Sequence, residues 1–227
     1  MGSMGADLAD LNNDLLPDLI VTEMLPMTEE RKKTKTLFES WDKQQLALKQ
    51  GYFNQYARNA LQRNLGKNTF FEVSRQAGVS GTEWSWGALL FDMNNNGLKD
   101  IFISNGIYKD LLDRDYLAYE ANEEKIKSRI HKKEKNVITS LIDAMPSQAV
   151  ANSVFYNQGD FNFENKSIEW GLGTPSFSNG SAYGDLDNDG DLDLVVNNVN
   201  MPSFLYENMT DTLNHRSIKL NLVTGKK

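Results

Sequence analysis

The sequence predicts a mainly β fold, part of a β-propeller with about three four-stranded blades and two α-helical insertions. Three observations lead to this prediction. A short acidic loop recurs three times, an apolar run typical of a strand follows each copy, and a pair of strand-like segments joined by an Asn/Gly turn precedes the second and third copies. One such pair together with one loop hairpin gives the four strands of a propeller blade.

The third copy of the loop spans residues 185–193 and is the most acidic. It has carboxylates at loop positions 1, 3, 5 and 9 and glycine at position 6, which is typical of calcium loops because Ca²⁺ takes six to eight oxygen ligands. The expected ligands are the side chains of Asp185, Asp187, Asp189 and Asp193 and the backbone carbonyl of Asp191. Val196 stands where a helix-loop-helix calcium hand has glutamate, and 194–196 is apolar, so we expect strands on both sides. The alternative is an acidic turn that holds no metal.

The other two copies of the loop carry fewer carboxylates. The second offers Asp92, Asn94, Asn96, the carbonyl of Leu98, and Asp100, and the first offers Asp10, Asn12, Asp14, the carbonyl of Leu16, and Asp18. Since calcium affinity rises with ligand charge, we rank the loops third, first, second. The first copy has Leu15 at the glycine position, where a side chain costs about 1 kcal/mol in the left-handed region. Either its turn differs or its site is empty.

These repeats resemble the FG-GAP/VCBS type of integrin-like β-propellers. They are most similar to those of bacterial surface proteins in which such repeats precede an ASPIC/UnbV domain, the type shared with cartilage acidic protein. The segments that carry the likeness, beside the loops, are 3–7, 21–26, 84–86, 104–108 and 175–180. The resemblance spans nearly the whole chain. It implies calcium-stabilised blades and a non-catalytic scaffold that is secreted, on the cell surface or associated with the outer membrane.

The composition is that of a globular chain of 227 residues, 40% hydrophobic and 24% charged, without cysteine. No apolar run reaches the length of a membrane span. The first residues lack a signal-peptide pattern and lead directly into a strand, so we expect a fragment of a longer protein. The net charge is −7. Outside 27–64 and 109–149 there are 8 basic and 19 acidic residues, which argues against nucleic-acid binding by the blades, because a polyanion needs clustered cations.

Six divisions are expected along the chain. They are 1–26, half a blade with the first calcium loop; 27–60, a helical insertion; 61–107, a blade with the second loop; 108–150, a second helical insertion; 151–200, a blade with the third loop; and 201–227, the start of another blade or a linker to a C-terminal domain. Residues 217–222 alternate polar and apolar and indicate one more strand. Because propellers close with four to eight blades, further blades or another copy would complete this one.

Both insertions show apolar residues at helical spacing. In the first we expect two helices broken near Gly51, with aromatic residues in a core and the basic run 31–35 on a solvated helix face or in an anion-binding patch. Each insertion begins one strand after an acidic loop. Because such a strand carries the chain about 20 Å, the insertions should lie on the side opposite the metals, where we expect partner binding.

The expected function is a non-catalytic scaffold that binds a protein or glycan ligand. Aromatic side chains, and amide side chains that follow the loop strands, are candidate contacts, although core packing and turns explain the same residue types. They are Trp84, Trp86, Tyr108, Asn105 and Asn198. A calcium-dependent polysaccharide lyase and a structural spacer are the alternatives. A lyase needs a general base with a tuned pKa, and the two histidines, His131 and His215, have the surroundings of surface residues.

Overall fold

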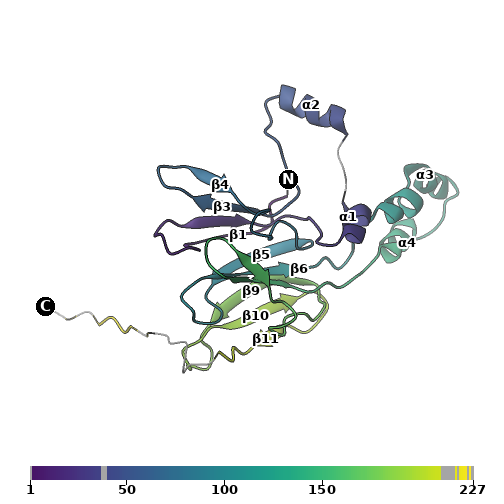
Figure 1. Cartoon of the computed structure of the whole chain (residues 1–227). Coiled ribbons are helices and arrows are strands. Elements are labelled where there is room, and N and C mark those ends of the chain that lie inside the picture. Colours follow the sequence, from purple (N-terminus) through teal and green to yellow (C-terminus); the bar gives the residue numbers. More distant parts are fainter. Residues whose placement is uncertain (1, 37–39, 211–217, 219, 224, 226–227) are drawn as a thin grey trace.

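The computed structural model describes residues 2–36, 40–210, 218, 220–223 and 225. Within these residues the strands form three antiparallel sheets, packed face to face in an open stack (Figure 1). The first sheet contains β1 (Ala6–Ala9), β2 (Asp18–Val21), β3 (Ala60–Asn64) and β4 (Phe70–Glu72). The second contains β5 (Ser85–Phe91), β6 (Asp100–Asn105), β7 (Ser153–Asn157) and β8 (Phe163–Asn165). The third contains β9 (Ser178–Gly184), β10 (Asp193–Asn198) and β11 (Phe204–Tyr206).

The structure groups the strands differently from the expected divisions. Each sheet begins with the hairpin that carries an acidic loop; the Asn/Gly hairpin follows it in the first two sheets, and β11 follows it in the described part of the third. The expected blades 61–107 and 151–200 therefore each combine the second hairpin of one sheet with the first hairpin of the next. The strands of 1–26 also have partners, because Ile20 of β2 pairs with Leu61 of β3 across the whole first insertion. Long insertions hid these pairings, since sequence reasoning favours neighbouring segments as partners.

Alternate side chains of the middle strands face different sheets. In β6, Ile101 and Ile103 belong to the core between the first and second sheets, and Phe102 belongs to the core between the second and third. All three are fully buried. A strand covered on both faces is apolar without alternation, which is the pattern of 101–103. The second sheet therefore packs with the first sheet through one face and with the third sheet through the other.

The helices occur in the two insertions, as the sequence predicts. The first insertion has α1 (Glu29–Lys35) and α2 (Trp41–Lys49), and the second has the π-helical turn η1 (Tyr116–Glu120), α3 (Glu123–His131) and α4 (Val137–Ala144). The insertions leave β2 and β6, and α1, α3 and α4 lie at the end of the sheets away from the acidic loops (Figure 1). The opposite placement of helices and loops is confirmed.

The break between α1 and α2 is not near Gly51. It comes before Ser40, whose side chain accepts the backbone N–H of Lys43 and so caps the start of α2. Gly51 follows the end of α2 with a φ of 88°, the left-handed conformation that commonly ends a helix. Gly51 therefore marks the end of the second helix and not the junction of two.

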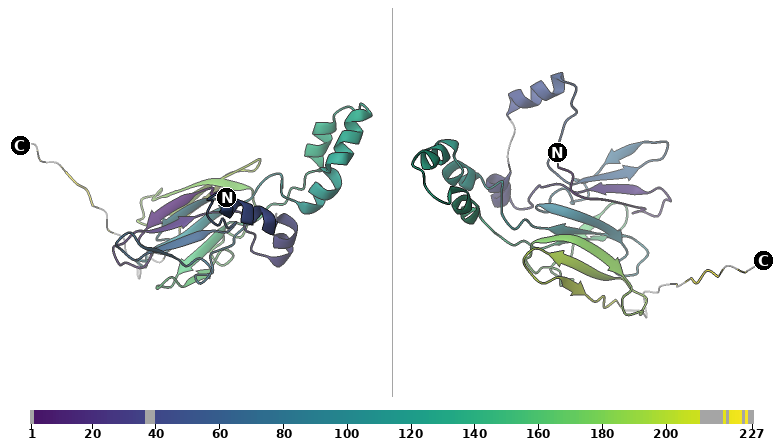
Figure 2. Two further views of the ribbon diagram at one scale, coloured as in Figure 1. Left: turned by 90° about the horizontal axis from the view of Figure 1, so that it is seen from above. Right: turned by 180° about the vertical axis from the view of Figure 1, so that it is seen from behind.

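The aromatic residues of the first insertion do not form the expected core. Trp41 is 71% exposed and Phe53 is 91% exposed, and α2 buries none of its residues. Figures 1 and 2 show α2 standing apart from the sheets. Its helical pattern is weak, with apolar residues on several sides, so it has no single face to bury. Phe38 lies outside the described residues.

The basic run 31–35 is partly built into the molecule. Arg31 forms an ion pair of 2.8 Å with Glu83, and Lys35 pairs with Asp110 at 3.3 Å and with Asp113. All five side chains are at most 15% exposed. These contacts fix α1 against the second sheet and the second insertion, so Arg31 and Lys35 belong neither to a solvated face nor to a free anion-binding patch.

The strand expected at 217–222 is not observed in the described residues of that segment. Ile218, Leu220 and Leu222 belong to no strand and are 80–92% exposed, while 217 and 219 lie outside the described residues. The third sheet accordingly has three strands in the part that the structure describes. In that part, no helix combines the length and the apolar character needed to cross a membrane.

Candidate metal centre

The three acidic loops share one backbone conformation. The residues at loop positions 4 and 6 have positive φ in every copy: Asn13 58° and Leu15 67°, Asn95 54° and Gly97 89°, Asn188 67° and Gly190 101°. Leu15 thus takes the conformation that glycine takes in the other loops, with its side chain 89% exposed. The turn of the first loop does not differ, and its leucine is strained by about 1 kcal/mol.

The aspartate at position 9 fastens each loop to its sheet. Asp18, Asp100 and Asp193 are buried, and each accepts two backbone N–H groups. One N–H comes from position 2 of the same loop, at 3.0 Å in each case, from Leu11, Met93 and Leu186. The other comes from an asparagine of the second hairpin: Asn64 at 2.8 Å, Asn157 at 2.8 Å and Asn208 at 2.9 Å. A metal would share these oxygens with the backbone.

Burial changes the acidity of two of these aspartates. It raises the pKa of Asp100 to about 7, against the backbone N–H groups of Asn157 and Met93, which lower it. Burial also raises the pKa of Asp18, where the amides of Asn64 and Leu11 act in the opposite direction. A buried carboxylate loses the hydration of its charged form, and two neutral donors restore only part of it.

The three asparagines that donate to position 9, here called the latch asparagines, also join neighbouring loops. Each side-chain amide donates to the position 8 carbonyl of its own sheet's loop: Asn64 to Pro17 at 3.0 Å, Asn157 to Lys99 at 2.8 Å, Asn208 to Leu192 at 3.2 Å. Asn157 and Asn208 donate further to position 2 of the preceding sheet's loop, to Leu11 at 2.8 Å and Met93 at 2.7 Å. Sequence reasoning missed this role. The signal was an asparagine in the same place before each turn, in 63–66 and 156–159.

The third loop brings three carboxylates together. Among the described residues, Asp185, Asp187 and Asp189 are the one group of three acidic side chains placed to hold a metal ion, with one oxygen from each within 4.8 Å of the others. Asp185 Oδ1 is buried and has no hydrogen-bond partner in the described part of the chain. Like charges this close repel one another unless a cation lies among them. The donor set of carboxylate oxygens fits a hard cation such as Ca²⁺.

The side chain of Asp191 adds a fourth carboxylate beside this group. Asp191 is 1% exposed, and neither of its oxygens has a hydrogen bond of normal geometry to a described residue. Burial, together with the charges of Asp189 and Asp193, raises the pKa of Asp191 to about 6. The sequence analysis assigned only the backbone carbonyl of Asp191 to the metal, because position 7 of a calcium loop contributes its carbonyl.

The first and second loops are arranged differently. Their position 1 carboxylates accept backbone N–H groups of the same loop: Asp10 from Asp14 at 3.1 Å and Leu15 at 2.8 Å, and Asp92 from Asn96 at 3.1 Å and Gly97 at 2.8 Å. In the first loop, Asn12 also donates to Asp14 at 2.9 Å. The oxygens of Asp10 and Asp92 are therefore already hydrogen-bonded, whereas Asp185 Oδ1 in the third loop has no partner in the described part of the chain. Metal binding by Asn94, Asn96, Leu98 and Leu16 in these loops stays a prediction.

An FG-GAP-like repeat matches residues 142–196. The matched segment runs from α4 through β7, β8, β9 and the third loop into β10, and it covers less than half of the chain. It supports a relationship to the FG-GAP family and a propeller-type binding scaffold. No curated protein matches the chain. The matched repeat includes the second hairpin of the second sheet and the loop hairpin of the third, so a unit of sequence here spans two sheets.

The candidate ligand contacts lie at the end of the sheets away from the loops, and most are used within the protein. Asn105 is fully buried and donates to the Ala151 carbonyl at 3.1 Å, and Asn198 is 7% exposed and donates to the Pro202 carbonyl at 2.7 Å. Trp86 donates to the Gly106 carbonyl at 2.6 Å. Neither asparagine is open to solvent, so turn and strand-end chemistry explains both.

All three aromatic candidates contact other rings. The centroids of Trp84 and Trp86 are 6.3 Å apart, and Tyr108, 39% exposed, meets the edge of Phe177 at 5.2 Å. The indole N–H of Trp84 is buried and has no partner in the described part of the chain. Tyr108 is the one member of this set that presents a substantial surface to a ligand.

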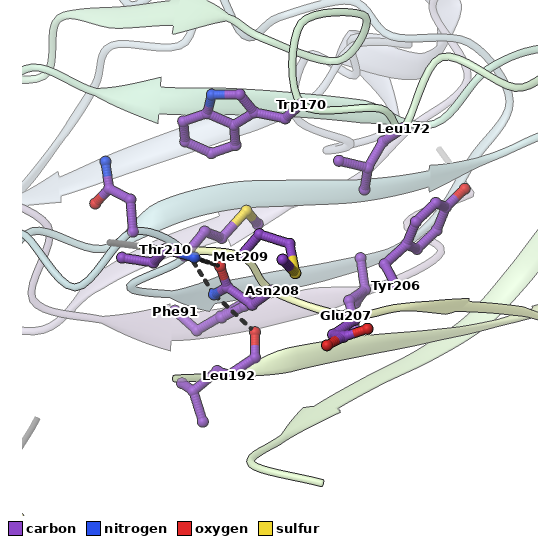
Figure 3. A pocket seen from close by; sticks show the side chains of 12 residues that line it. Phe91, Trp170, Leu172, Leu192, Tyr206, Glu207, Asn208, Met209 and Thr210 are labelled. Atoms are coloured by element: carbon purple, nitrogen blue, oxygen red, sulfur yellow. Dashed lines mark hydrogen bonds between the residues drawn. The ribbon is translucent and has the colours of Figure 1, made fainter. Parts of the chain in front are cut away.

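A pocket of about 380 Å³ lies between the second and third sheets, beside the second and third loops. Figure 3 shows Trp170 and Leu172 on one side and Leu192 on the other, with Asn208 between them. Between the first and second sheets, the corresponding place is filled by Phe161 and Phe163, which follow Asn157, the equivalent of Asn208. The residues at the equivalent distance after Asn208 lie outside the described part of the chain.

Proposed function

We propose that the loop at 185–193 binds Ca²⁺ and that the bound ion stabilises the stack of sheets. One observation carries this proposal: the oxygens of Asp185, Asp187 and Asp189 converge within 4.8 Å without a basic residue paired to them in the described part of the chain. The buried carboxylate of Asp191 adds negative charge at the same place. A cation would remove the repulsion among these groups and bind only the folded loop, because the unfolded chain does not gather them.

Thermal unfolding with Ca²⁺ and with excess chelator tests this proposal. At a concentration 100-fold above the dissociation constant, Ca²⁺ is expected to add about 2.7 kcal/mol to the free energy of unfolding. Asp187→Asn removes one ligand charge and should abolish most of the shift. Asp143→Asn, an exposed aspartate on α4, is the matched control and should leave the shift intact. Equal melting temperatures in Ca²⁺ and chelator would show that the loop is an acidic turn without a metal.

We further propose that the chain is a segment of an FG-GAP/VCBS-type propeller that serves outside the cytoplasm as a non-catalytic scaffold for a protein or glycan ligand. The matched repeat at 142–196 and the stack of sheets support this role. The insertions carry exposed aromatic side chains, with Trp41, Phe53 and Tyr119 each more than 70% exposed. Such surface is typical of interaction sites. Glycan-array and pull-down binding, each compared with Trp41→Ala, test this role.

The lyase alternative requires a base positioned beside a cation. His131 is exposed on α3, in an insertion at the end of the sheets away from the loops, and His215 lies outside the described residues. The scaffold proposal therefore expects no unsaturated product, measured by ultraviolet absorbance, when the chain is incubated with uronate polymers and Ca²⁺. Product formation that Asp187→Asn abolishes would favour the lyase instead. Stabilisation by Ca²⁺ without any ligand would favour the spacer.

A further inference from the structure

The turn between α3 and α4 carries a group of basic side chains. The residues from 130 to 136 are all exposed, and we call this segment the basic tip. Four of them have basic side chains that form no hydrogen bond or ion pair with a described residue: His131, Lys132, Lys133 and Lys135. The acidic residue of the turn, Glu134, is paired with Arg129 at 2.8 Å. The lysine charges of the basic tip are therefore not neutralised within the described part of the chain.

The basic tip stands on a braced turn. Arg129 donates to Glu134 and also to the side chain of Ser140 on α4, at 2.8 Å and 2.6 Å. Lys132 is the C-cap of α3, while Lys133 and Lys135 lie beyond it, so the dipole of that helix does not account for their charges. The turn is thus built without help from its lysines, which leaves their ammonium groups free to contact an external anion.

The basic tip lies at the far end of the second insertion. At the near end, Lys109 donates to the Met145 carbonyl at 3.2 Å, and the backbone N–H of Asp110 donates to Pro146 at 2.9 Å. These bonds hold the chain just after the last residue of α4, Ala144, so the tip is at the other end of that helix. Figures 1 and 2 show α3 and α4 projecting away from the sheets.

Two properties of the basic tip favour a lipid surface over a soluble anion. Ile130 and Ile138 flank the lysines and are 62% and 74% exposed, and lysine beside exposed aliphatic side chains is typical of segments that rest in the headgroup region of a membrane. The tip also protrudes from the molecule (Figure 2), so it cannot enclose a small ligand. A fluid headgroup layer adapts to a protruding end, whereas a folded protein would need a matching groove.

The distribution of charge favours one orientation at such a surface. Outside 27–64 and 109–149, the chain has 8 basic and 19 acidic residues. The three acidic loops are among them, at the end of the sheets away from α3 and α4 (Figure 1). An anionic surface would attract the basic tip and repel the acidic loops, and such a field orients a molecule as it approaches.

We propose that the basic tip binds the surface of a membrane that contains anionic lipids. The ammonium groups of Lys132, Lys133 and Lys135 contact lipid phosphates, and Ile130 and Ile138 enter the headgroup region. The contact is peripheral and reversible, because a few lysines and two isoleucines supply only modest binding. It requires neither a cation in the loop at 185–193 nor a protein or glycan ligand on the scaffold.

Flotation of the chain with lipid vesicles tests this contact, using phosphatidylcholine alone and phosphatidylcholine mixed with phosphatidylglycerol. The chain should bind only the anionic vesicles, and less so as salt is added, because salt screens the lysine charges. The triple variant Lys132→Ala, Lys133→Ala, Lys135→Ala should lower the partition coefficient about 100-fold, since each lysine near an anionic surface contributes about fivefold. The double variant Ile130→Ser, Ile138→Ser should weaken binding to vesicles but not to heparin, a soluble polyanion.

The matched control is the triple variant Lys43→Ala, Lys49→Ala, Lys67→Ala, which removes the same charge at exposed lysines outside the basic tip. It should bind vesicles like the unmodified chain. Failure to bind anionic vesicles at low salt overturns the proposal, as does equal loss in the two triple variants while both keep the native circular dichroism. Binding to heparin without binding to vesicles would assign the tip to a soluble polyanion and overturn it. Vesicle binding seen with Ca²⁺ and lost in chelator would assign the contact to the acidic loops and also overturn it.

A fluorescence measurement reports the orientation. The chain has no cysteine, so a single introduced cysteine gives one labelling site. A polarity-sensitive dye on Thr139→Cys, at an exposed residue of α4 next to Ile138, should shift to the blue on anionic vesicles. The same dye on Asn162→Cys, at an exposed residue of the turn between β7 and β8, should not shift. A shift at residue 162 that equals or exceeds the shift at residue 139 would overturn the proposal.

Discussion

The side-chain amide of Asn157 donates to the carbonyl of Leu11, 2.8 Å away in the neighbouring sheet. The same amide donates to Lys99 of its own sheet at 2.8 Å, and the backbone N–H of Asn157 donates to Asp100. One buried side chain thus connects two acidic loops that are about 80 residues apart in sequence. The contact is non-local, so it forms only when the two sheets pack together. Asn208 repeats the arrangement between the second and third loops.

Asn157→Asp should destabilise the chain by about 3 kcal/mol, because a buried carboxylate would then face two carbonyl oxygens without a donor between them. Chemical denaturation measures this change. Asn162→Asp, at an exposed asparagine of the same turn whose side chain donates to Gln158, introduces the same charge and should cost less than about 0.5 kcal/mol. Similar losses in the two variants would argue against a latch at Asn157.

Leu15→Gly should stabilise the chain by about 0.5–1 kcal/mol, because glycine adopts the φ of 67° without strain. Leu15→Ala is the control. Alanine also removes the exposed leucine side chain but keeps the Cβ atom that causes the strain, so no gain is expected. A gain in both variants would point to the loss of exposed apolar surface instead.

The double substitution Asn94→Asp, Asn96→Asp should give the second loop a calcium site. It supplies the carboxylates that the third loop has at positions 3 and 5, and the hydrogen bonds that these side chains accept from Asn96 and Leu98 are kept. Calcium content per chain, measured by mass spectrometry after dialysis, should rise by one ion, since affinity follows ligand charge. Asn95→Asp adds the same charge at position 4, which is not a ligand position of a calcium loop, and should leave the content unchanged.

Glu72→Gln should change how stability depends on pH. Burial of Glu72 acts to raise its pKa, but hydrogen bonds from Arg58 and Ser74 outweigh it and lower the pKa from 4.5 to about 2. The charged form therefore stabilises the fold above pH 4.5, and this contribution is lost as the pH falls toward 2. Glu72→Gln should cost about 0.5–1 kcal/mol at pH 7 and nothing near pH 2. A constant difference at all pH values would exclude the ion pair as its cause.

The fold class and the two insertions could be predicted because their signals are local. Strand patterns, the spacing of the acidic residues and helical periodicity each lie within a dozen residues. The division into sheets could not be predicted, because Ile20 pairs with Leu61 and Phe102 with Val154 only after an insertion has intervened. Sequence order favoured the hairpin that precedes each loop, and the structure favours the hairpin that follows it.

The metal-ligand oxygens of the candidate site could be predicted from the sequence, but the hydrogen bonds that hold the loop in place could not. The spacing of Asp185, Asp187 and Asp189 indicates convergence without any tertiary information. The role of position 9 differs, because one of the two backbone N–H donors to Asp100 comes from Asn157 in the second hairpin of the sheet, which is distant in the sequence. The surface of α2 was also mispredicted, since aromatic residues usually indicate a core, and Trp41 has no neighbour to cover it in the described part of the chain.

Acidic loops and helical insertions leave the sheets at opposite ends, and α1 is fixed by the ion pairs of Arg31 and Lys35. Any change in length or sequence within the insertions therefore takes place about one strand length from the loops. Sequence changes in the insertions can therefore accumulate without altering the acidic loops, the third of which we propose binds Ca²⁺.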